Sequence, residues 1–450
     1  MRAVIALALP LFMNSGIQAI LNLTDTWFIG RISTDALAAV GAVYWPLLAI
    51  LLFLGGIGIA VQTLSAQAFG ARRLRRASHV AWMGVWGALF TIPVFALAAW
   101  IGEHFLEAVG LAPDLAMLAY DYWWPRLIGG PLAVALWAVL SFFNGIGRVR
   151  VNLLVNSIVL IVNAVLNEVL IFELGWGIAG SAWATTLALV LGLSIALGYL
   201  LSAEMRRTFA SAHTWRWNWQ TLRMAIALGL PMGLFIAFDV IAMAVFQLIQ
   251  VRLGAVDGAA TQIVMMVTSI SYMPAVGIGM AGTTLVGQSI GAGDKAWALR
   301  LGNATILLCV IYMTIVGILL GLAGPWLMPW FIASGDAQAT DVIALATRLL
   351  WIACCYQFFD GLNLGAGFCL RGAGDARVPA VALLLLSWLV FIPLTHSLSF
   401  APGQGWVDWL PQWGAGAAGG WWAAVIYVSL LGTMLFLRWR SLAWQKISLT

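Results

Sequence analysis

The feature that most constrains this chain is a series of apolar runs, each long enough to cross a lipid bilayer. A membrane-spanning helix needs about 20 mostly apolar residues, whereas a transmembrane β-strand alternates apolar and polar positions. Residues 50–60, for example, carry no polar side chain, so the runs predict helices. Breaks at charged residues, Gly and Pro divide the chain into twelve spans, near residues 5–29, 38–66, 79–101, 116–142, 152–173, 180–203, 224–250, 258–288, 299–323, 342–369, 379–400 and 418–437.

The composition excludes the other broad classes of protein. Of the 450 residues, 63% are apolar and 9% are charged, whereas a typical soluble domain is roughly 25% charged. A soluble fold would need more charge to cover its surface, and a disordered chain would need fewer apolar residues. The sequence therefore predicts an all-α polytopic membrane protein.

The basic residues predict how the chain is oriented. If twelve spans separate loops that alternate sides, 18 of the 22 Lys and Arg residues lie on the side of the two termini. The four on the other side are Arg31, Arg126, Arg252 and Arg348. By the positive-inside rule, both termini are cytoplasmic in a multi-pass protein of the cytoplasmic (inner) membrane. The net charge of +5 then describes a cytoplasmic rim rather than a nucleic-acid surface.

A repeat divides the chain into two halves. Residues 63–71 read TLSAQAFGA and residues 284–292 read TLVGQSIGA, an offset of 221 that also relates Pro10 to Pro231. Later, GIGRVRV at 145–151 corresponds to GAGDARV at 372–378, an offset of 227. Both members of each pair are expected on the cytoplasmic side, so the halves are parallel repeats. We expect two six-helix bundles, residues 1–210 and 211–450, with a central cleft, the architecture of an alternating-access transporter.

Three acids stand inside predicted spans, where each costs roughly 2.5–3.5 kcal/mol by insertion scales. They are Asp25, Asp239 and Asp360, and no Lys or Arg falls within one helical turn of them along the sequence. One interpretation is a structural hydrogen bond to a neighbouring helix. The other is that the carboxylates take up a proton or Na⁺ and release it on the other side of the membrane.

Polar residues near these acids recur at helical spacing and so form stripes that cannot face lipid. One interpretation of the stripes is hydrogen bonding between helices, and the other is a wet cavity. We assign cation or proton coupling to the three acids with Asn163 and Asn167, and the substrate cavity to Gln18, Asn22, Gln247, Tyr356, Gln357 and Asn363. The stripes are Asn14, Gln18, Asn22 and Asp25; Asn152, Asn156, Asn163 and Asn167; and Tyr356, Gln357, Asp360 and Asn363.

Two further features bear on the mechanism. Pro10 lies inside the first span, fifteen residues before Asp25, and is either a fixed kink or a hinge that couples the state of Asp25 to the bend of the helix. The candidate cavity residues are acids, amides, Met and aromatics with no basic cluster, which favours lipophilic cations as substrates. An anionic lipid-linked saccharide would require Arg or Lys in the cavity.

Several segments resemble the multidrug and toxic compound extrusion (MATE) family. They are LTDTWFIGRISTDALAAVG at 23–41, FFNGIGRVRVNLLVNSIVLIVNAVLNEVLIF at 142–172, GWGIAGSAWAT at 175–185 and YQFFDGLNLGAGFCLRGAGDAR at 356–377. The resemblance implies a MATE/MOP-type fold and an antiporter that expels organic cations in exchange for Na⁺ or H⁺.

The resemblance also implies roles for individual residues. Asp25 matches the family's acid in the first span, and Asp360 matches the acid of span 10 in the NorM-like branch. Asp239 stands where that branch usually has Glu. Asn163 and Asn167 match a polar pair, of which one part of the family has Asp at the second position. Pro10 matches a proline associated with bending of the first span.

Together these observations predict an efflux antiporter for organic cations and amphiphilic drugs, driven by H⁺ or Na⁺. The alternative is a flippase for lipid-linked saccharide precursors of the wider superfamily. A membrane enzyme or redox subunit would need buried Lys–Glu relays or metal-ligand clusters, so we expect no enzymatic activity and no cofactor. No metal ion is expected other than Na⁺ at the coupling acids. The expected partners are small molecules and the lipid bilayer, not nucleic acid, and the chain is expected to be a monomer.

Overall fold

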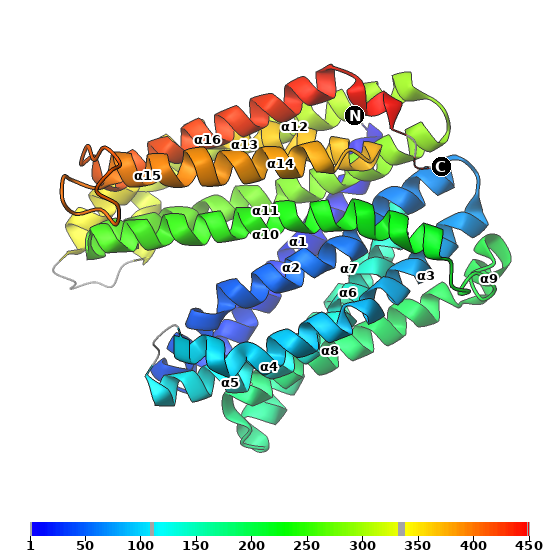
Figure 1. Cartoon of the computed structure of the whole chain (residues 1–450), viewed down its shortest axis with the longest axis horizontal. Helices are drawn as coiled ribbons and strands as arrows, with labels where there is room; N and C mark the ends of the chain where they lie inside the picture. The colour runs from blue at the N-terminus through cyan, green and yellow to red at the C-terminus, as the bar shows by residue number, and fades with distance from the viewer. Residues whose placement is uncertain (1, 109–111, 332–337, 448, 450) are drawn as a thin grey trace.

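The computed structural model describes residues 2–108, 112–331, 338–447 and 449, and the regular elements in these residues are helices. Both termini lie at one end of the molecule, called here the terminal end; the opposite, loop end carries the segment between α15 and α16 (Figure 1). The α-helices are α1 (Arg2–Gly30), α2 (Thr34–Gly70), α3 (Leu74–Phe90), α4 (Ile92–Ala108), α5 (Pro113–Ile128), α6 (Gly130–Gly145), α7 (Val149–Glu168), α8 (Gly177–Leu200), α9 (Ala203–Phe209), α10 (Trp219–Leu253), α11 (Ala255–Gly291), α12 (Lys295–Leu327), α13 (Ala339–Ala373), α14 (Arg377–Leu386), α15 (Ile392–Ser399) and α16 (Gly416–Arg440).

The number of spans agrees with the prediction. Among the described residues, eleven helical segments are long and apolar enough to cross a membrane, and α5 with α6 supplies a twelfth. That pair is bent by 42°, where the sequence predicted one continuous span over 116–142. Pro131 explains the break, since a proline in the first turn of α6 has no N–H to donate back to α5.

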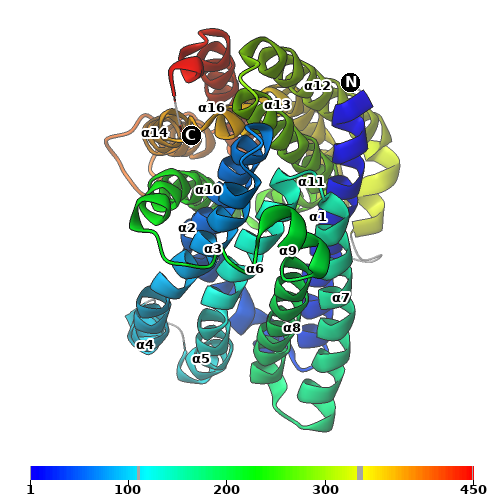
Figure 2. The same ribbon diagram turned by 90° about the vertical axis from the view of Figure 1, so that its right-hand side faces the viewer.

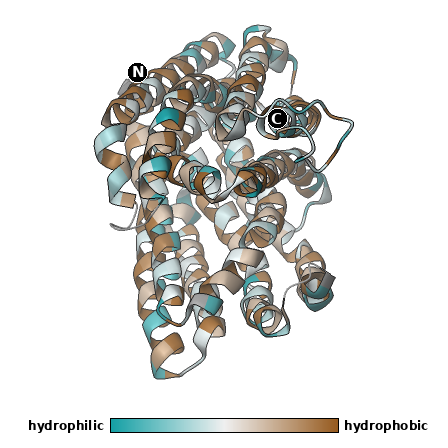
Figure 3. Cartoon of the chain, turned by 90° about the vertical axis from the view of Figure 1, so that its left-hand side faces the viewer, coloured by the Kyte–Doolittle hydropathy of each residue, from teal (hydrophilic) through white to brown (hydrophobic). Residues whose placement is uncertain are grey.

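Hydrophobic residues recur along all the helices (Figure 3), and many large ones are exposed, as expected for a protein whose solvent is lipid. Trp100 is 71% exposed and Leu389 is 69% exposed, which would be unfavourable in water. The largest apolar core is made of residues between 235 and 444. Two other cores are made of residues between 21 and 232, one of them together with Ala376. The division at residues 210/211 stays a prediction.

Four helices make most of the contact between the first part of the chain and the second. Viewed from the terminal end, α1, α2, α10 and α11 lie between the other helices, which form a group above and a group below (Figure 2). Glycines bring their backbones together, for example where α2 crosses α10 and where α1 crosses α11. A Cβ on Gly56 of α2 would lie 2.2 Å from the carbonyl oxygen of Gly229 in α10, and a Cβ on Gly277 of α11 would lie 2.7 Å from the backbone nitrogen of Phe12 in α1. Gly56 and Gly277 are separated by the repeat offset of 221.

Candidate functional site

The first acid, Asp25 of α1, is 8% exposed and has a donor on each carboxylate oxygen. Nδ2 of Asn167 donates to Oδ1 at 2.7 Å, and the hydroxyl of Thr185 donates to Oδ2 at 3.2 Å. The same Nδ2 lies 3.1 Å from Oδ1 of Asn163, whose own amide lies 3.2 Å from the Thr185 oxygen. The structure thus brings the predicted residues Asp25, Asn163 and Asn167 together. Sequence reasoning missed Thr185 because it comes from a different helix, α8.

The rest of the polar stripe on α7 makes hydrogen bonds between helices. Nδ2 of Asn156 lies 2.7 Å from Oδ1 of Asn14 in α1 and 2.6 Å from Oδ1 of Asn152. Nδ2 of Asn152 donates to Oδ1 of Asn144 in α6 at 3.1 Å. This half of the stripe fits the interpretation of polar contacts that hold α1, α6 and α7 together.

An arginine lies beside Asp25. Arg126, in the last turn of α5, lines a pocket of about 80 Å³ with Asn22, Asp25, Tyr44 and Tyr122, and it is close enough to Asp25 for an electrostatic interaction. The sequence predicts cavity residues without a basic cluster, and this single half-buried arginine is an addition to them. The sequence predicts Arg126 on the outer side of the membrane, and the structure places it in the last turn of α5, beside Asp25.

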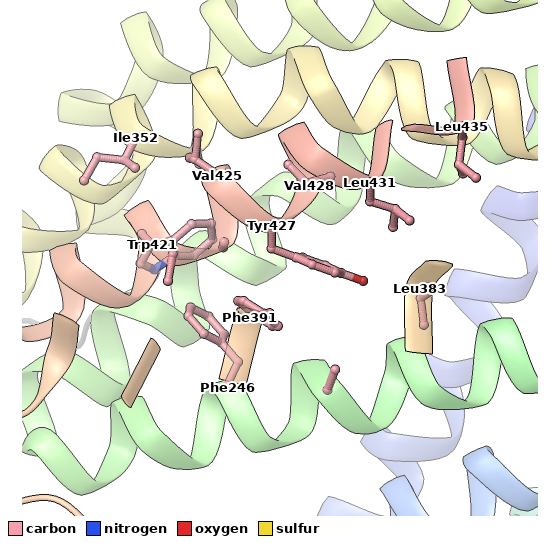
Figure 4. Packing of buried hydrophobic residues seen from close by; sticks show 14 of the residues in the cluster. Phe246, Ile352, Leu383, Phe391, Trp421, Val425, Tyr427, Val428, Leu431 and Leu435 are labelled. Carbon is pink, nitrogen blue, oxygen red and sulfur yellow. The ribbon is translucent and has the colours of Figure 1, made fainter. Parts of the chain in front are cut away.

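The second site holds both other acids. Asp360 of α13 is 3% exposed, and its Oδ1 accepts a 3.1 Å hydrogen bond from Nδ2 of Asn363. Asp239 of α10 is half-buried and accepts a 3.4 Å hydrogen bond from the hydroxyl of Tyr427 in α16. The two carboxylates are near enough to interact electrostatically. The ring of Tyr427 stacks on Phe391, with centroids 4.7 Å apart, which fixes the direction of its hydroxyl (Figure 4).

Three buried oxygen atoms at this second site have no hydrogen-bond donor: Asp360 Oδ2, Gln357 Oε1 and Asn363 Oδ1. The amide nitrogen of Gln357 is directed elsewhere, donating to Oγ of Ser271 at 2.5 Å. Buried acceptors without donors are unusual in proteins and call for a ligand, a proton or water. The predicted cavity residues Gln357 and Asn363 thus lie beside Asp360, while the ring of Tyr356 packs near Trp421 at 6.5 Å between centroids.

A second arginine lies at this site. Arg371 is 7% exposed, and its guanidinium lies 4.7 Å from the ring centroids of both Phe235 and Phe368. It is close enough to Asp239 for an electrostatic interaction. The prediction that this span ends at residue 369, with Arg371 in a cytoplasmic loop, is wrong, because α13 continues to Ala373. An arginine three residues after Phe368 on one helix face was the available signal.

Of the remaining predicted residues, Gln247 lines a separate cleft, whereas Gln18, Asn22 and Pro10 lie on α1, the helix of Asp25. Gln247 lines a cleft of about 920 Å³ at the loop end, between α2, α4 and α5 on one side and α10 on the other. Its amide donates to the carbonyl of Gly258 at 3.4 Å. On α1, Gln18 is half-buried, Asn22 is exposed, and the helix continues unbroken through Pro10. The two acid sites share no helix.

The chain resembles known proteins over nearly its whole length. The model of the MatE family matches residues 10–169 and 231–396, two segments whose starts are separated by the repeat offset of 221. The probable multidrug resistance protein NorM of Bradyrhizobium diazoefficiens is 32% identical over 449 residues, covering 97% of this chain and 92% of that protein. The protein of the same name from Rhizobium meliloti is 28% identical over 453 residues, covering 98% and 92%.

Among solved structures, the crystal structure of MATE in complex with MaL6 has the same fold, with a TM-score of 0.86 at 19% identity, covering 98% of this chain and 95% of that one. Within the described residues, eleven apolar spans and the bent α5–α6 pair define a polytopic helical membrane protein, and the family model and the NorM relatives place it among transport proteins rather than enzymes. The match of the family model to both halves of the chain makes the assignment specific. The chain belongs to the MatE family of multidrug and toxic compound extrusion proteins.

Proposed function

We propose that the chain is a secondary active efflux antiporter that exports organic cations and amphiphilic drugs in exchange for H⁺ or Na⁺. The observation that carries the proposal is the donor-free carboxylate oxygen of Asp360, buried with two donor-free amide oxygens. Oxygen atoms are the ligands that hard cations select, and a proton on Asp360 would equally complete the site. A buried acid is costly in a membrane and is commonly retained for an ion or proton pathway.

The shape of the molecule supports alternating access. The cleft of about 920 Å³ lies at the loop end, with residues of α2, α4 and α5 on one wall and of α10 on the other. In the proposed cycle, a cation or proton from outside binds Asp239 and Asp360, with Asp25 also involved. Binding favours the state that releases drug outward, and the bundles 1–210 and 211–450 then rock against each other. The ion shifts this equilibrium only through its different affinity for the two states.

The proposal also includes the orientation of the chain and the membrane in which it lies. The excess of basic residues on the side of the termini supports cytoplasmic termini and a cytoplasmic (inner) membrane location. The names of the NorM relatives refer to multidrug resistance, which supports small amphiphilic substrates for this chain. The walls of the cleft agree, since Trp45, Trp123 and Leu248 offer apolar surface to such molecules. We propose that the chain acts as a monomer.

The test is efflux of an ethidium-like dye by purified protein in proteoliposomes, with Na⁺ and pH gradients imposed separately. Asp360→Asn removes a charge and keeps the shape, so it should abolish driven efflux while the protein stays folded. The matched control is Glu168→Gln, which neutralises an exposed acid on α7 and should leave efflux intact. Full efflux by the Asp360→Asn variant would disprove the assignment, and the gradient that drives the parent identifies the coupling ion.

The flippase alternative has its own test because Arg126, which is half-buried, and Arg371, which is buried, are the kind of side chain that an anionic substrate would need. Arg126 interacts electrostatically with Asp25, and Arg371 with Asp239. These acids offset the charge of the arginines, and Asp360 adds a further carboxylate at the second site, which favours cations there over a phosphate-linked sugar. Translocation of a fluorescent lipid-linked saccharide in the same vesicles, without dye efflux, would reverse this preference.

A further inference from the structure

The repeated nonapeptides form the contact between the two halves at the terminal end. Thr63 and Gln67 of α2, and their repeat partners Thr284 and Gln288 of α11, are each four residues apart, so each pair lies on one face of its helix. Thr63 is 1% exposed, Gln67 2% and Thr284 0%. Neither the antiporter proposal nor the acid sites uses these four side chains.

The first pair reaches from α2 into the second half of the chain. The hydroxyl of Thr63 donates to the carbonyl of Arg371 at 2.9 Å, and the side-chain amide Nε2 of Gln67 donates to the carbonyl of Gly372 at 3.0 Å. Both acceptors lie in the last turn of α13, where carbonyls lack the regular donor four residues later; that of Arg371 also accepts from the capping N–H of Gly374 at 2.9 Å.

The second pair makes the same contacts in the opposite direction. The hydroxyl of Thr284 donates to the carbonyl of Asn144 at 3.0 Å, and Nε2 of Gln288 donates to the carbonyl of Gly145 at 2.8 Å. These acceptors end α6, just as those of the first pair end α13. The donors are related by the offset of 221 and the acceptors by the offset of 227, the two offsets of the sequence repeat.

Two glycines bring the helices close enough for these bonds. A Cβ on Gly70 would lie 1.9 Å from the carbonyl oxygen of Gln288, and a Cβ on Gly291 would lie 2.0 Å from the carbonyl oxygen of Gln67. No other residue fits at either position without separating the backbones of α2 and α11. The reciprocal contact is therefore backbone against backbone, reinforced by four hydrogen bonds that cross between the halves.

We propose that Thr63, Gln67, Thr284 and Gln288 form a reciprocal clasp that holds the terminal end closed while the cleft at the loop end is open. The clasp must break on both sides before a substrate can enter from the terminal end. Polar side chains suit such a gate, because entering water can form hydrogen bonds with the donors and acceptors that separate when the gate opens. Separated apolar side chains would gain no such bonds with water. This inference rests on the proposed alternating-access function and assigns positioning residues to it.

The clasp also has a direct connection to the second acid site. Helix α13 carries Asp360 and, eleven residues later, the carbonyl of Arg371 that accepts from Thr63. A shift of α13 on binding of a cation at Asp360 would therefore move the acceptors of the clasp. The side chain of Arg371 contacts the rings of Phe235 in α10 and Phe368 in α13, which links that last turn to α10.

The test measures the separation of the halves at the terminal end by double electron–electron resonance. Spin labels are placed at Arg75→Cys of α3 and Ala296→Cys of α12, both exposed, with the exposed Cys355 replaced by serine. The clasp variant is Thr63→Val with Thr284→Val, which keeps the side-chain shape and removes three bonds, since Nε2 of Gln62 also donates to the hydroxyl of Thr284 at 3.0 Å. We expect the ratio of long to short distances to rise at least about tenfold, because three hydrogen bonds of ordinary net strength are lost.

Two further variants make the result decisive. Thr283→Val, whose hydroxyl donates to Phe368 within the same half at 2.8 Å, should leave the distances of the parent unchanged. Thr63→Ser with Thr284→Ser keeps both hydroxyls and should restore the parent distribution. Unchanged distances in the valine variant would overturn the clasp. Because the distances are measured without transport, failure of the parent to move dye would count against the antiporter and leave the clasp standing.

Discussion

The side-chain amide of Asn167 donates a 2.7 Å hydrogen bond to Oδ1 of Asp25, and Thr185 donates to the other oxygen. Both oxygens of Asp25 therefore have donors, whereas Oδ2 of Asp360 has none. The two acid sites thus differ in kind. At the first site both carboxylate oxygens are paired and the unpaired oxygen is an amide, Oδ1 of Asn167, whereas at the second site a carboxylate oxygen is free to accept a cation or a proton.

This difference predicts the effect of Asn167→Asp. A second carboxylate would stand within hydrogen-bonding distance of Asp25, and two like charges at that distance cannot both stay ionised, so the pair must hold a proton. Dye efflux by the variant should become more dependent on a pH gradient than efflux by the parent. The measurement is the initial efflux rate in proteoliposomes at a series of external pH values.

The matched control is Asn156→Asp, which places a carboxylate on the same face of α7 but beside Asn14 instead of an acid. It should not acquire the same pH dependence. Identical pH profiles for the parent and Asn167→Asp would contradict the role assigned to the Asn167–Asp25 contact.

Much of the fold could be predicted because lipid imposes a strong pattern on sequence. Apolar runs separated by charges define the spans, and helical spacing of four correctly grouped Asn163 with Asn167. The bend between α5 and α6 was missed because apolar composition continues through it, and only the local chemistry of Pro131 interrupts the helix. The extent of α13 was missed because a charge was taken as the end of a span.

The contents of the sites were harder to predict than the spans. Thr185, Arg126 and Tyr427 reach the acids from helices distant in sequence, and no spacing along one helix reports such contacts. Arg371 illustrates the physical reason. Its burial depends on two aromatic faces and a carboxylate, which come from α10 and α13 and offset the cost of removing the charge from water.

Arg371 predicts a difference between two substitutions. Its planar guanidinium lies over the rings of both Phe235 and Phe368, 4.7 Å from each centroid, an arrangement that lysine cannot reproduce. Arg371→Met should lower the free energy of unfolding by about 2 kcal/mol, the scale of a desolvated cation–π contact, and should impair efflux. Arg371→Lys should be intermediate in both. Arg377→Met, at an exposed arginine of α14, is the control for loss of charge alone.

The ion pair between Arg148 and Glu204 predicts a dependence of stability on pH. The hydrogen bond from the Arg148 guanidinium lowers the pKa of the exposed Glu204 carboxyl. A lowered pKa contributes stability above the ordinary glutamate value of roughly 4.3, and the contribution is lost as the pH falls through the lowered value. Glu204→Gln should therefore melt slightly below the parent at pH 7. The difference should vanish in acid and shrink in high salt; a difference that persists below pH 3 or so would contradict the ion pair as its source.

The glycine crossings make the last prediction. A Cβ on Gly56 would lie 2.2 Å from the carbonyl oxygen of Gly229 and 2.4 Å from the backbone nitrogen of Gly233, and backbone atoms cannot turn aside as a flexible side chain can. Gly56→Ala should therefore force α2 and α10 apart and lower the free energy of unfolding by about 1–3 kcal/mol, the usual cost of overpacking. Gly198→Ala in α8 is the control, since nothing lies within 4 Å of its Cβ position. There alanine should be neutral or stabilise the protein by up to about 1 kcal/mol through its helix propensity. The measurement is the melting temperature of the parent and of both variants in the same detergent. Equal melting temperatures for the Gly56→Ala variant and the parent would contradict the close contact between α2 and α10.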